Sequence, residues 1–239
     1  MRTTLLHLVL IVLSVWAVYG QSVVGQFVDW DDGALIRLND HIASGKIDGL
    51  IWHWENAHDR LYIPAVYTVW WCISATVGLK PWAFHTANLV VFSAAACIGY
   101  SILRMLVGQP WPALAGALLL ALHPLQVEPV AWVTGMKDVL CLFFCLGAIA
   151  LYLRRGWYWL ATICFALAML CKPSAVVVPV ILVAIDQIVL RSSWRSTLWR
   201  AGPWLAGALV MGLVAAHVQP PNRDFGGPLW SRPLIAADS

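Results

Sequence analysis

Long apolar runs are the feature that most constrains this chain of 239 residues. A helix of about 20 apolar residues is long enough to cross the ~30 Å hydrocarbon core of a bilayer. Charged residues make up only 11% of the chain, against about 25% in soluble domains. We therefore predict an all-α, polytopic transmembrane helical bundle of about seven spans in a lipid bilayer. The runs are residues 4–19, 84–107, 111–134, 139–153, 157–171, 173–190 and 202–218.

The third run contains its own interruption. The sequence "HPLQVEP" puts Pro124 and Pro129 inside it, and proline breaks a helix because it lacks an N–H and clashes with the preceding turn. A broken helix at membrane depth is tolerated only where protein or water satisfies the freed backbone groups. We therefore expect this segment to line a cavity.

An eighth apolar stretch, residues 62–79, is ambiguous, and it decides the orientation of every later span. Short cytoplasmic loops are rich in Lys and Arg. If 62–79 does not cross, seven arginines share one side and 11 of the 12 acidic residues share the other, all but Asp186. We therefore interpret 62–79 as a re-entrant or surface-lying segment of an outward-facing catalytic loop, 21–82, with the amino terminus in the cytoplasm. The arginines are Arg2, Arg104, Arg154, Arg155, Arg191, Arg195 and Arg200.

The first run admits a second interpretation. Its basic start, its apolar middle and the small residues near its end are also typical of a cleaved signal peptide. The run leads straight into an acidic loop without any charge of its own. That arrangement favours an uncleaved first span.

The acidic loop begins with the sequence "DWDDG", in which Asp29, Asp31 and Asp32 fall within four positions. A solvated turn is one interpretation, because Asp-Asp-Gly is good turn chemistry. The predicted topology, however, brings Glu128 and Asp138 to the same face. Carboxylates gathered near a membrane surface suit general-base work on a hydroxyl, or the ordering of a divalent cation beside a phosphate. Lysines on that face, Lys137 and Lys172, suit the phosphate's charge.

Histidines give weaker signals. His85 and Asn88 lie three apart on one helical face, a spacing more typical of a helix–helix hydrogen bond than of a ligand pair, and His123 is similar. His53 and His58 lie five apart and miss the four-residue spacing of a helical zinc site. We therefore predict no metal site of that kind.

Several motifs, taken in order, resemble one family. They are "FVDWDD", "LYIPAVYTVWW", "GLKPWAFHTANLVVF", "ALLLALHPLQVEPVAWVTGMKDVL" and "LAMLCKPSAVVVPVILVAIDQ". Over about residues 26–190 they resemble the amino-terminal membrane part of the tetratricopeptide-repeat-containing O-mannosyltransferase-like proteins, which belong to the GT-C superfamily of membrane glycosyltransferases. The resemblance implies a polyprenyl-phosphate-linked sugar donor, with mannose a candidate, and inverting transfer to an acceptor hydroxyl on a protein or another molecule. We expect an integral protein of a bacterial inner membrane.

The resemblance also implies roles for particular residues. The acidic pair that follows the first span in the family matches Asp31 and Asp32, the expected catalytic residues. A second family segment, with the pattern HP, VE, AW and RKD, matches residues 123–138, except that Met136 stands in place of the usual Arg. The residues expected to bind substrate are His85, Asn88, His123, Glu128, Trp132, Lys137, Asp138 and Lys172.

Other interpretations stay open at this stage. Relatives continue into tandem repeats, and no 34-residue repeat is visible here. We therefore expect either a fragment or a shortened relative, with a GT-C-like transmembrane domain at 1–218 and an outward-facing tail at 219–239. A non-catalytic membrane scaffold and a secondary transporter are the alternative functions. The sequence contains no basic tract of the kind that would indicate a nucleic-acid partner.

Overall fold

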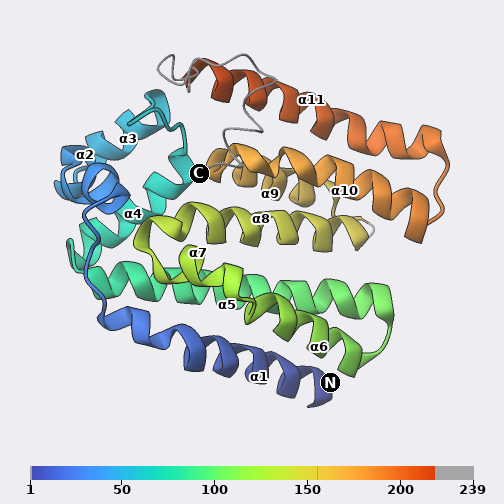
Figure 1. Cartoon of the computed structure of the whole chain (residues 1–239). Helices are drawn as coiled ribbons and strands as arrows, with labels where there is room; N and C mark the ends of the chain where they lie inside the picture. Colours follow the sequence, from blue (N-terminus) through green and yellow to red (C-terminus); the bar gives the residue numbers. More distant parts are fainter. Residues whose placement is uncertain (1, 155, 219–239) are drawn as a thin grey trace, which may run out of the picture.

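The computed structural model describes residues 2–154 and 156–218, and within them every regular element is a helix (Figure 1). The predicted all-α class is confirmed, whereas the predicted tail at 219–239 lies outside the described residues. The longer helices run roughly side by side across Figure 1 and, with the short α10, form the body of the molecule. They are α1 (Arg2–Tyr19), α5 (Pro81–Val107), α6 (Pro110–Ala121), α8 (Met136–Leu153), α9 (Tyr158–Cys171), α10 (Val178–Ala184) and α11 (Trp194–Val218).

Shorter elements connect these helices. Between α1 and α5 lie η1 (Gly20–Val24), η2 (Gly33–Arg37), α2 (Asp40–Ala43), α3 (Ile47–Glu55) and α4 (Pro64–Val77). Between α6 and α8 lie η3 (Pro124–Gln126), α7 (Val127–Ala131) and η4 (Val133–Gly135). Helix α10 is preceded by η5 (Pro173–Val177) and followed by η6 (Ile185–Val189).

Proline and glycine set many of the boundaries. Helices α4, α5 and α6 each begin at a proline, which suits a first helical position because its fixed φ matches the helix and its missing N–H has no partner to lose there. Helix α5 ends at Gly108, whose φ of 77° is a left-handed conformation that favours glycine.

In the part of the chain that the structure describes, four helices are long and apolar enough to cross a membrane: Arg2–Val24, Pro81–Val107, Val133–Leu153 and Trp194–Val218. A fifth candidate joins Pro110–Ala121 to Pro124–Ala131 through a bend of 52°. This bend is the interruption that the sequence predicts at "HPLQVEP". The apolar helices Tyr158–Cys171 and Pro173–Val189 are shorter, so the count of seven spans stays a prediction.

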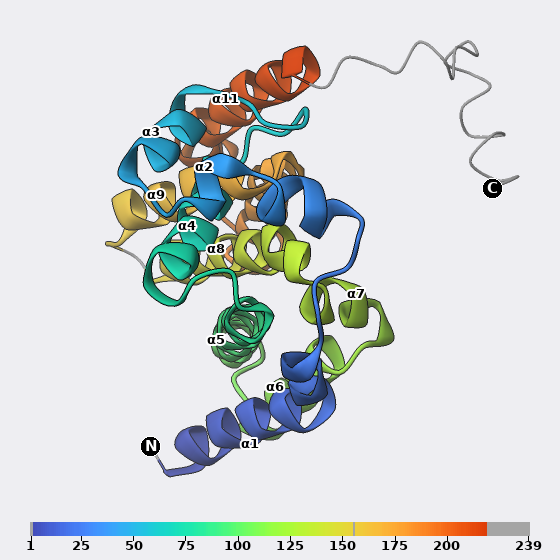
Figure 2. The same ribbon diagram turned by 90° about the vertical axis from the view of Figure 1, so that its left-hand side faces the viewer.

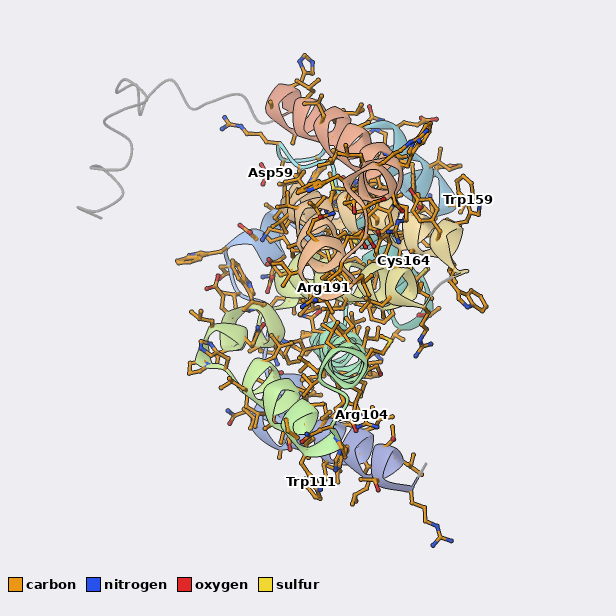
Figure 3. All side chains as sticks on the ribbon, turned by 90° about the vertical axis from the view of Figure 1, so that its right-hand side faces the viewer. Asp59, Arg104, Trp111, Trp159, Cys164 and Arg191 are labelled. Carbon is orange, nitrogen blue, oxygen red and sulfur yellow. The ribbon has the colours of Figure 1, made fainter. Side chains whose placement is uncertain are left out.

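The two ends of the bundle carry different charges. Arg104 and Arg191 lie at the end that faces the viewer in Figure 3, and the exposed Trp111 and Trp159 lie at the same end. The elements of the acidic loop, α2, α3 and α4, lie together at the opposite end, on the left of Figure 1 and facing the viewer in Figure 2. Helix α4 lies at that end with α2 and α3, and the non-crossing role of residues 62–79 stays a prediction. Its placement relative to a bilayer stays a prediction.

The buried carboxylate of Asp186 joins three segments at the end of the bundle that carries Arg104 and Arg191. Asp186, on η6, is fully buried; its Oδ2 accepts a hydrogen bond from the Tyr152 hydroxyl (2.7 Å) and lies 3.1 Å from Nη2 of Arg200. These residues belong to three segments, α8, η6 and α11. A buried ion pair is costly to break because the remaining charge is left uncompensated. This cluster therefore fixes the packing of the last helices far from the acidic loop.

Stacked rings hold the acidic loop together at the other end. The ring of His53, on α3, lies flat on Tyr67 of α4 with 3.8 Å between centroids. Asn39, at the start of α2, donates a hydrogen bond to Nε2 of His53 (3.2 Å). Burial, followed by the nearby His58 and His41, lowers the pKa of His53 to about 4. His53 therefore remains neutral at physiological pH and accepts the bond from Asn39.

This depressed pKa predicts acid-sensitive stability. In the unfolded chain His53 has an ordinary pKa of 6.5, whereas in the folded protein its pKa is about 4. Between these two pH values the unfolded chain therefore binds a proton that the folded protein does not bind. We expect the stabilising contribution of neutral His53 to be complete above pH 6.5 and to fall by up to about 3 kcal/mol as the pH drops to 4. Thermal unfolding in detergent at a series of pH values measures it. The unfolding temperature of the His53→Gln variant should depend less on pH than that of the unmodified chain. An equal dependence in both proteins would show that His53 is not the group responsible.

Candidate functional site

Asp32 fixes the acidic segment to the start of α8. Its side chain is fully buried, with Oδ2 accepting a hydrogen bond from the backbone N–H of Val28 (2.9 Å) and Oδ1 accepting one from the N–H of Thr134 (3.1 Å). Thr134 lies 102 positions further along the chain. Both carboxylate oxygens are thus used to join two distant pieces of backbone, and Asp32 acts as an anchor.

Asp31 faces the other way. Its Oδ2 lies 2.9 Å from Nζ of Lys137, and its side chain is 45% exposed, against 19% for the lysine. Lys137 also lies over the ring of Trp132, 5.7 Å from the centroid, and Trp132 meets the exposed Trp30 edge to face. The result is a carboxylate and an ammonium that solvent can reach, flanked by two indole rings. We call Asp31, Lys137, Trp30 and Trp132 the carboxylate site.

A second ion pair begins one residue later on α8. Asp138 pairs with Lys172, which follows α9. Both line one end of a groove of about 340 Å³ between α8 and α10. The rest of the lining is mainly apolar and includes Leu142, Ile149 and Val178. The groove thus combines a charged end with an apolar body, which suits a lipid with a charged head group.

Helix α5 supports the carboxylate site from behind. Nδ2 of Asn88 donates to the carbonyl of Trp132 (2.6 Å) and lies 3.4 Å from that of Val133. Asn88 therefore positions the backbone between the anchor at Thr134 and the ring of Trp132. His85, one turn earlier, lines a separate cavity between α1 and α7. Of this pair, only Asn88 makes a hydrogen bond in the described chain, and its acceptors are backbone carbonyls between α7 and α8.

Two predicted site residues lie elsewhere. His123 is exposed, and its Nδ1 accepts a hydrogen bond from the N–H of Leu125 (3.2 Å), which caps η3. Glu128 is exposed on α7. The hydrogen bonds and ion pairs of the described chain do not join either side chain to Asp31 or Lys137, and their proposed roles in binding stay predictions.

The donor set for a divalent cation is weak. Among residues 2–154 and 156–218, no three or more His, Cys, Asp or Glu side chains are grouped in a way that could hold a metal ion. Asp138 is already paired with Lys172. A divalent cation held by Glu128 and Asp138 stays a prediction.

Sequence reasoning missed the partner that makes Asp32 an anchor. That partner is the backbone N–H of Thr134, and a backbone group carries no residue signature that could have identified it. It also missed the contact between Trp30 and Trp132. The alternation "DWDD" offered a signal for Trp30, because a tryptophan between aspartates at a membrane boundary is well suited to a role at the site's rim.

Curated relatives are similar to this chain in sequence. The human (Homo sapiens) protein O-mannosyl-transferase TMTC2 is 25% identical over 169 residues, which cover 62% of this chain and 20% of that protein. Human TMTC4, also a protein O-mannosyl-transferase, is 27% identical over 195 residues, covering 67% of this chain and 26% of the relative. The Xenopus laevis protein O-mannosyl-transferase tmtc2 is 33% identical over 113 residues, covering 42% and 13%.

These matches span at most about a quarter of the length of the two human relatives. No family model matches the chain. No solved structure matches it. The sequence relatives therefore support an O-mannosyltransferase-like protein, as the motifs suggested.

Proposed function

We propose that this chain acts as a GT-C-type membrane glycosyltransferase that moves a sugar, with mannose the first candidate, from a polyprenyl-phosphate donor to a hydroxyl of a protein. The observation that carries the proposal is the pair of Asp31 and Lys137, joined at 2.9 Å, in which the carboxylate is 45% exposed. The buried anchor Asp32 holds this pair beside the start of α8. The names of the sequence relatives support protein as the acceptor and mannose as the sugar.

The proposed reaction is a single displacement. The acceptor oxygen attacks the anomeric carbon and forms a new C–O bond while the bond from that carbon to the phosphate oxygen breaks. The phosphate leaves with the electron pair, and Asp31 takes the proton of the acceptor hydroxyl. Because phosphate is a fair leaving group, the protein mainly positions the reactants and stabilises charge.

The ion pair suits this reaction because it can exchange partners. Because the Asp31 side chain is 45% exposed, water weakens its attraction to Lys137. A donor phosphate that attracts Lys137 therefore releases Asp31 to act as a base. The groove between α8 and α10 suits the polyprenyl chain, with Lys172 at its charged end positioned for the phosphate.

A transfer assay tests the function directly. Purified full chain in lipid is mixed with radiolabelled polyprenyl-phosphate sugars, mannose included, and with a serine- and threonine-containing peptide. We expect label to move from lipid to peptide. Absence of peptide product with every donor would overturn the proposal, and flux of a labelled solute across proteoliposomes without transfer would indicate a transporter.

Lys172 carries a separate prediction about the donor. Replacing Lys172 by glutamine removes a cation from the charged end of the groove and leaves Asp138 without its ion-pair partner, so a donor phosphate would meet an uncompensated negative charge. We expect the KM for the polyprenyl-phosphate donor to rise about tenfold, with a smaller change for the peptide acceptor. Lys46→Gln, which removes an exposed lysine of the acidic loop, is the matched control. Equal donor KM values in the two variants would contradict this role for Lys172.

A further inference from the structure

The turn between η6 and α11 contains an arginine in a strained backbone conformation. Arg191 has a φ of 47°, in the left-handed region that favours glycine, and it lies at the end of the bundle that faces the viewer in Figure 3. The backbone N–H of Ser192 donates to the carbonyl of Asp186 (2.9 Å) and holds the turn closed. Glycine would adopt this conformation at little cost. We therefore expect the exposed side chain of Arg191 to have a role that offsets the strain.

Other exposed cations lie near this turn. Arg195, on the first turn of α11, and Arg154, directly after α8, are exposed as well. The hydroxyl of Tyr158 donates to the carbonyl of Arg200 (2.8 Å), which brings the connection between α8 and α9 beside the start of α11. The ion pairs of the described chain do not include Arg154, Arg191 or Arg195. We call these three residues the arginine surface.

Acidic residues do not balance the arginine surface. Across residues 60–127 and 139–218 the sequence contains one acidic residue, Asp186. Its side chain is fully buried and already pairs with Arg200. The elements of the acidic loop lie at the opposite end of the bundle (Figure 1). The arginine surface therefore carries positive charge that attracts an anionic partner.

Exposed indole rings identify a lipid as this partner. Trp194 begins α11, and Trp157 and Trp159 lie around the start of α9; all three are exposed. Tryptophan is enriched at the depth of lipid head groups, because its ring is apolar and its N–H is polar. Helix α11 is also one of the four long apolar helices of the described chain that could cross a membrane. We therefore expect its first turn at a membrane surface, where the phosphate groups of phospholipids are concentrated.

We infer that the arginine surface binds the phosphate group of an anionic phospholipid, with Arg191 and Arg195 as its hydrogen-bond donors. A guanidinium group offers several N–H donors in one plane, which match the oxygens of a phosphate. Arg154 adds positive charge from the neighbouring connection. A bound lipid holds the turn before α11 in place and so stabilises the packing of the last helix. The inference is independent of the proposed function, because it involves neither the carboxylate site nor the groove between α8 and α10.

Thermal unfolding in lipid nanodiscs tests this binding. The purified full chain is placed in discs of phosphatidylcholine, or of phosphatidylcholine mixed with phosphatidylglycerol. We expect the anionic lipid to raise the unfolding midpoint by at least about 4 °C, because a ligand that binds the folded chain stabilises it. Arg191→Gly should lose at least about half of this gain. Each gain is taken within one protein, so a change in that protein's stability in phosphatidylcholine does not affect the comparison.

Arg60→Gly is the matched control. Arg60 is also exposed and has a φ of 61°, but it lies between α3 and α4 in the acidic loop. Its replacement changes the charge and the backbone in the same way, and it should leave the gain unchanged. Equal gains in the unmodified chain and in Arg191→Gly, or equal losses in Arg191→Gly and Arg60→Gly, would overturn the site.

Spin-labelled lipids, whose motion slows at the protein surface, measure the binding directly. The relative affinity for phosphatidylglycerol should fall about fivefold in Arg191→Gly, with no change for phosphatidylcholine. An equal loss for both lipids would contradict a site for the anionic head group. Inorganic phosphate, added to phosphatidylcholine discs at constant ionic strength, represents a soluble ligand. A rise in the unfolding midpoint as large as that produced by phosphatidylglycerol would overturn the lipid as the ligand.

Discussion

We expect the substitution Asp31→Asn to lower the rate of sugar transfer at least about a hundredfold. The amide keeps the size of the carboxylate but loses its charge and its ability to accept a proton. General-base catalysis contributes roughly 10²–10⁴-fold, equivalent to about 3–5 kcal/mol of barrier. Because the Asp31 side chain is 45% exposed, we expect folding and membrane insertion to survive. Initial rates of label transfer at saturating donor and peptide measure the loss.

Asp29→Asn provides the control for Asp31. Asp29 lies two positions earlier in the same acidic segment, and it pairs with Arg37 at 3.0 Å with its own side chain 93% exposed. The substitution removes the same charge from the same loop without touching the carboxylate site. It should change the rate by less than about threefold. An active chain that tolerated Asp31→Asn as well as Asp29→Asn would leave the proposed mechanism without its base.

Asp32→Asn is expected to fail for a different reason. Both oxygens of Asp32 accept backbone N–H groups, and an asparagine can offer only one oxygen while turning an NH₂ group toward the other N–H. A buried N–H left without an acceptor costs about 1–3 kcal/mol, and more when a donor faces it. We expect the thermal unfolding midpoint in detergent to fall by several degrees, and transfer to fall at least about a hundredfold because the acidic segment no longer stays beside Thr134.

The two variants can therefore be told apart by stability. Asp31→Asn should reduce transfer with an almost unchanged unfolding midpoint, whereas Asp32→Asn should lower both. Protease accessibility of residues 25–40 gives a second measurement, because a released loop is cut more readily. An Asp32→Asn protein that unfolded at the unmodified temperature with an intact loop would show that the bonds to Val28 and Thr134 do not anchor the segment.

The structure changes how the acidic pair is understood. From the motif, Asp31 and Asp32 are equivalent candidates for the catalytic base. Their environments differ sharply, since one is fully buried against backbone and the other is open beside Lys137. Neighbouring side chains on a turn point in different directions. The turn therefore directs Asp32 toward the backbone N–H groups of Val28 and Thr134 and directs Asp31 toward Lys137.

Local rules fixed the helical architecture of the chain. Apolar runs such as 84–107 and 139–153 can only be helices if they are to satisfy their own backbone in an apolar medium, and α5 and α8 occupy those runs within a few residues. The prolines of "HPLQVEP" required a break, and the bend of 52° between α6 and Pro124–Ala131 is found there. Composition and periodicity are properties of short stretches, so these features need no knowledge of the fold.

Pairing between distant residues was decided only by the tertiary structure. The charges of Asp31, Lys137, Asp138 and Lys172 were visible in the sequence, but the choice of partner depends on how α8 is rotated against the acidic loop and against the end of α9. That rotation follows from the packing of α5, α8 and α9 and from backbone groups such as the N–H of Thr134, which any residue except proline would supply. The residue types thus determined which charged groups the chain could offer, and the packing of its helices determined that Asp32 is buried as an anchor and that Asp31 is left open to solvent.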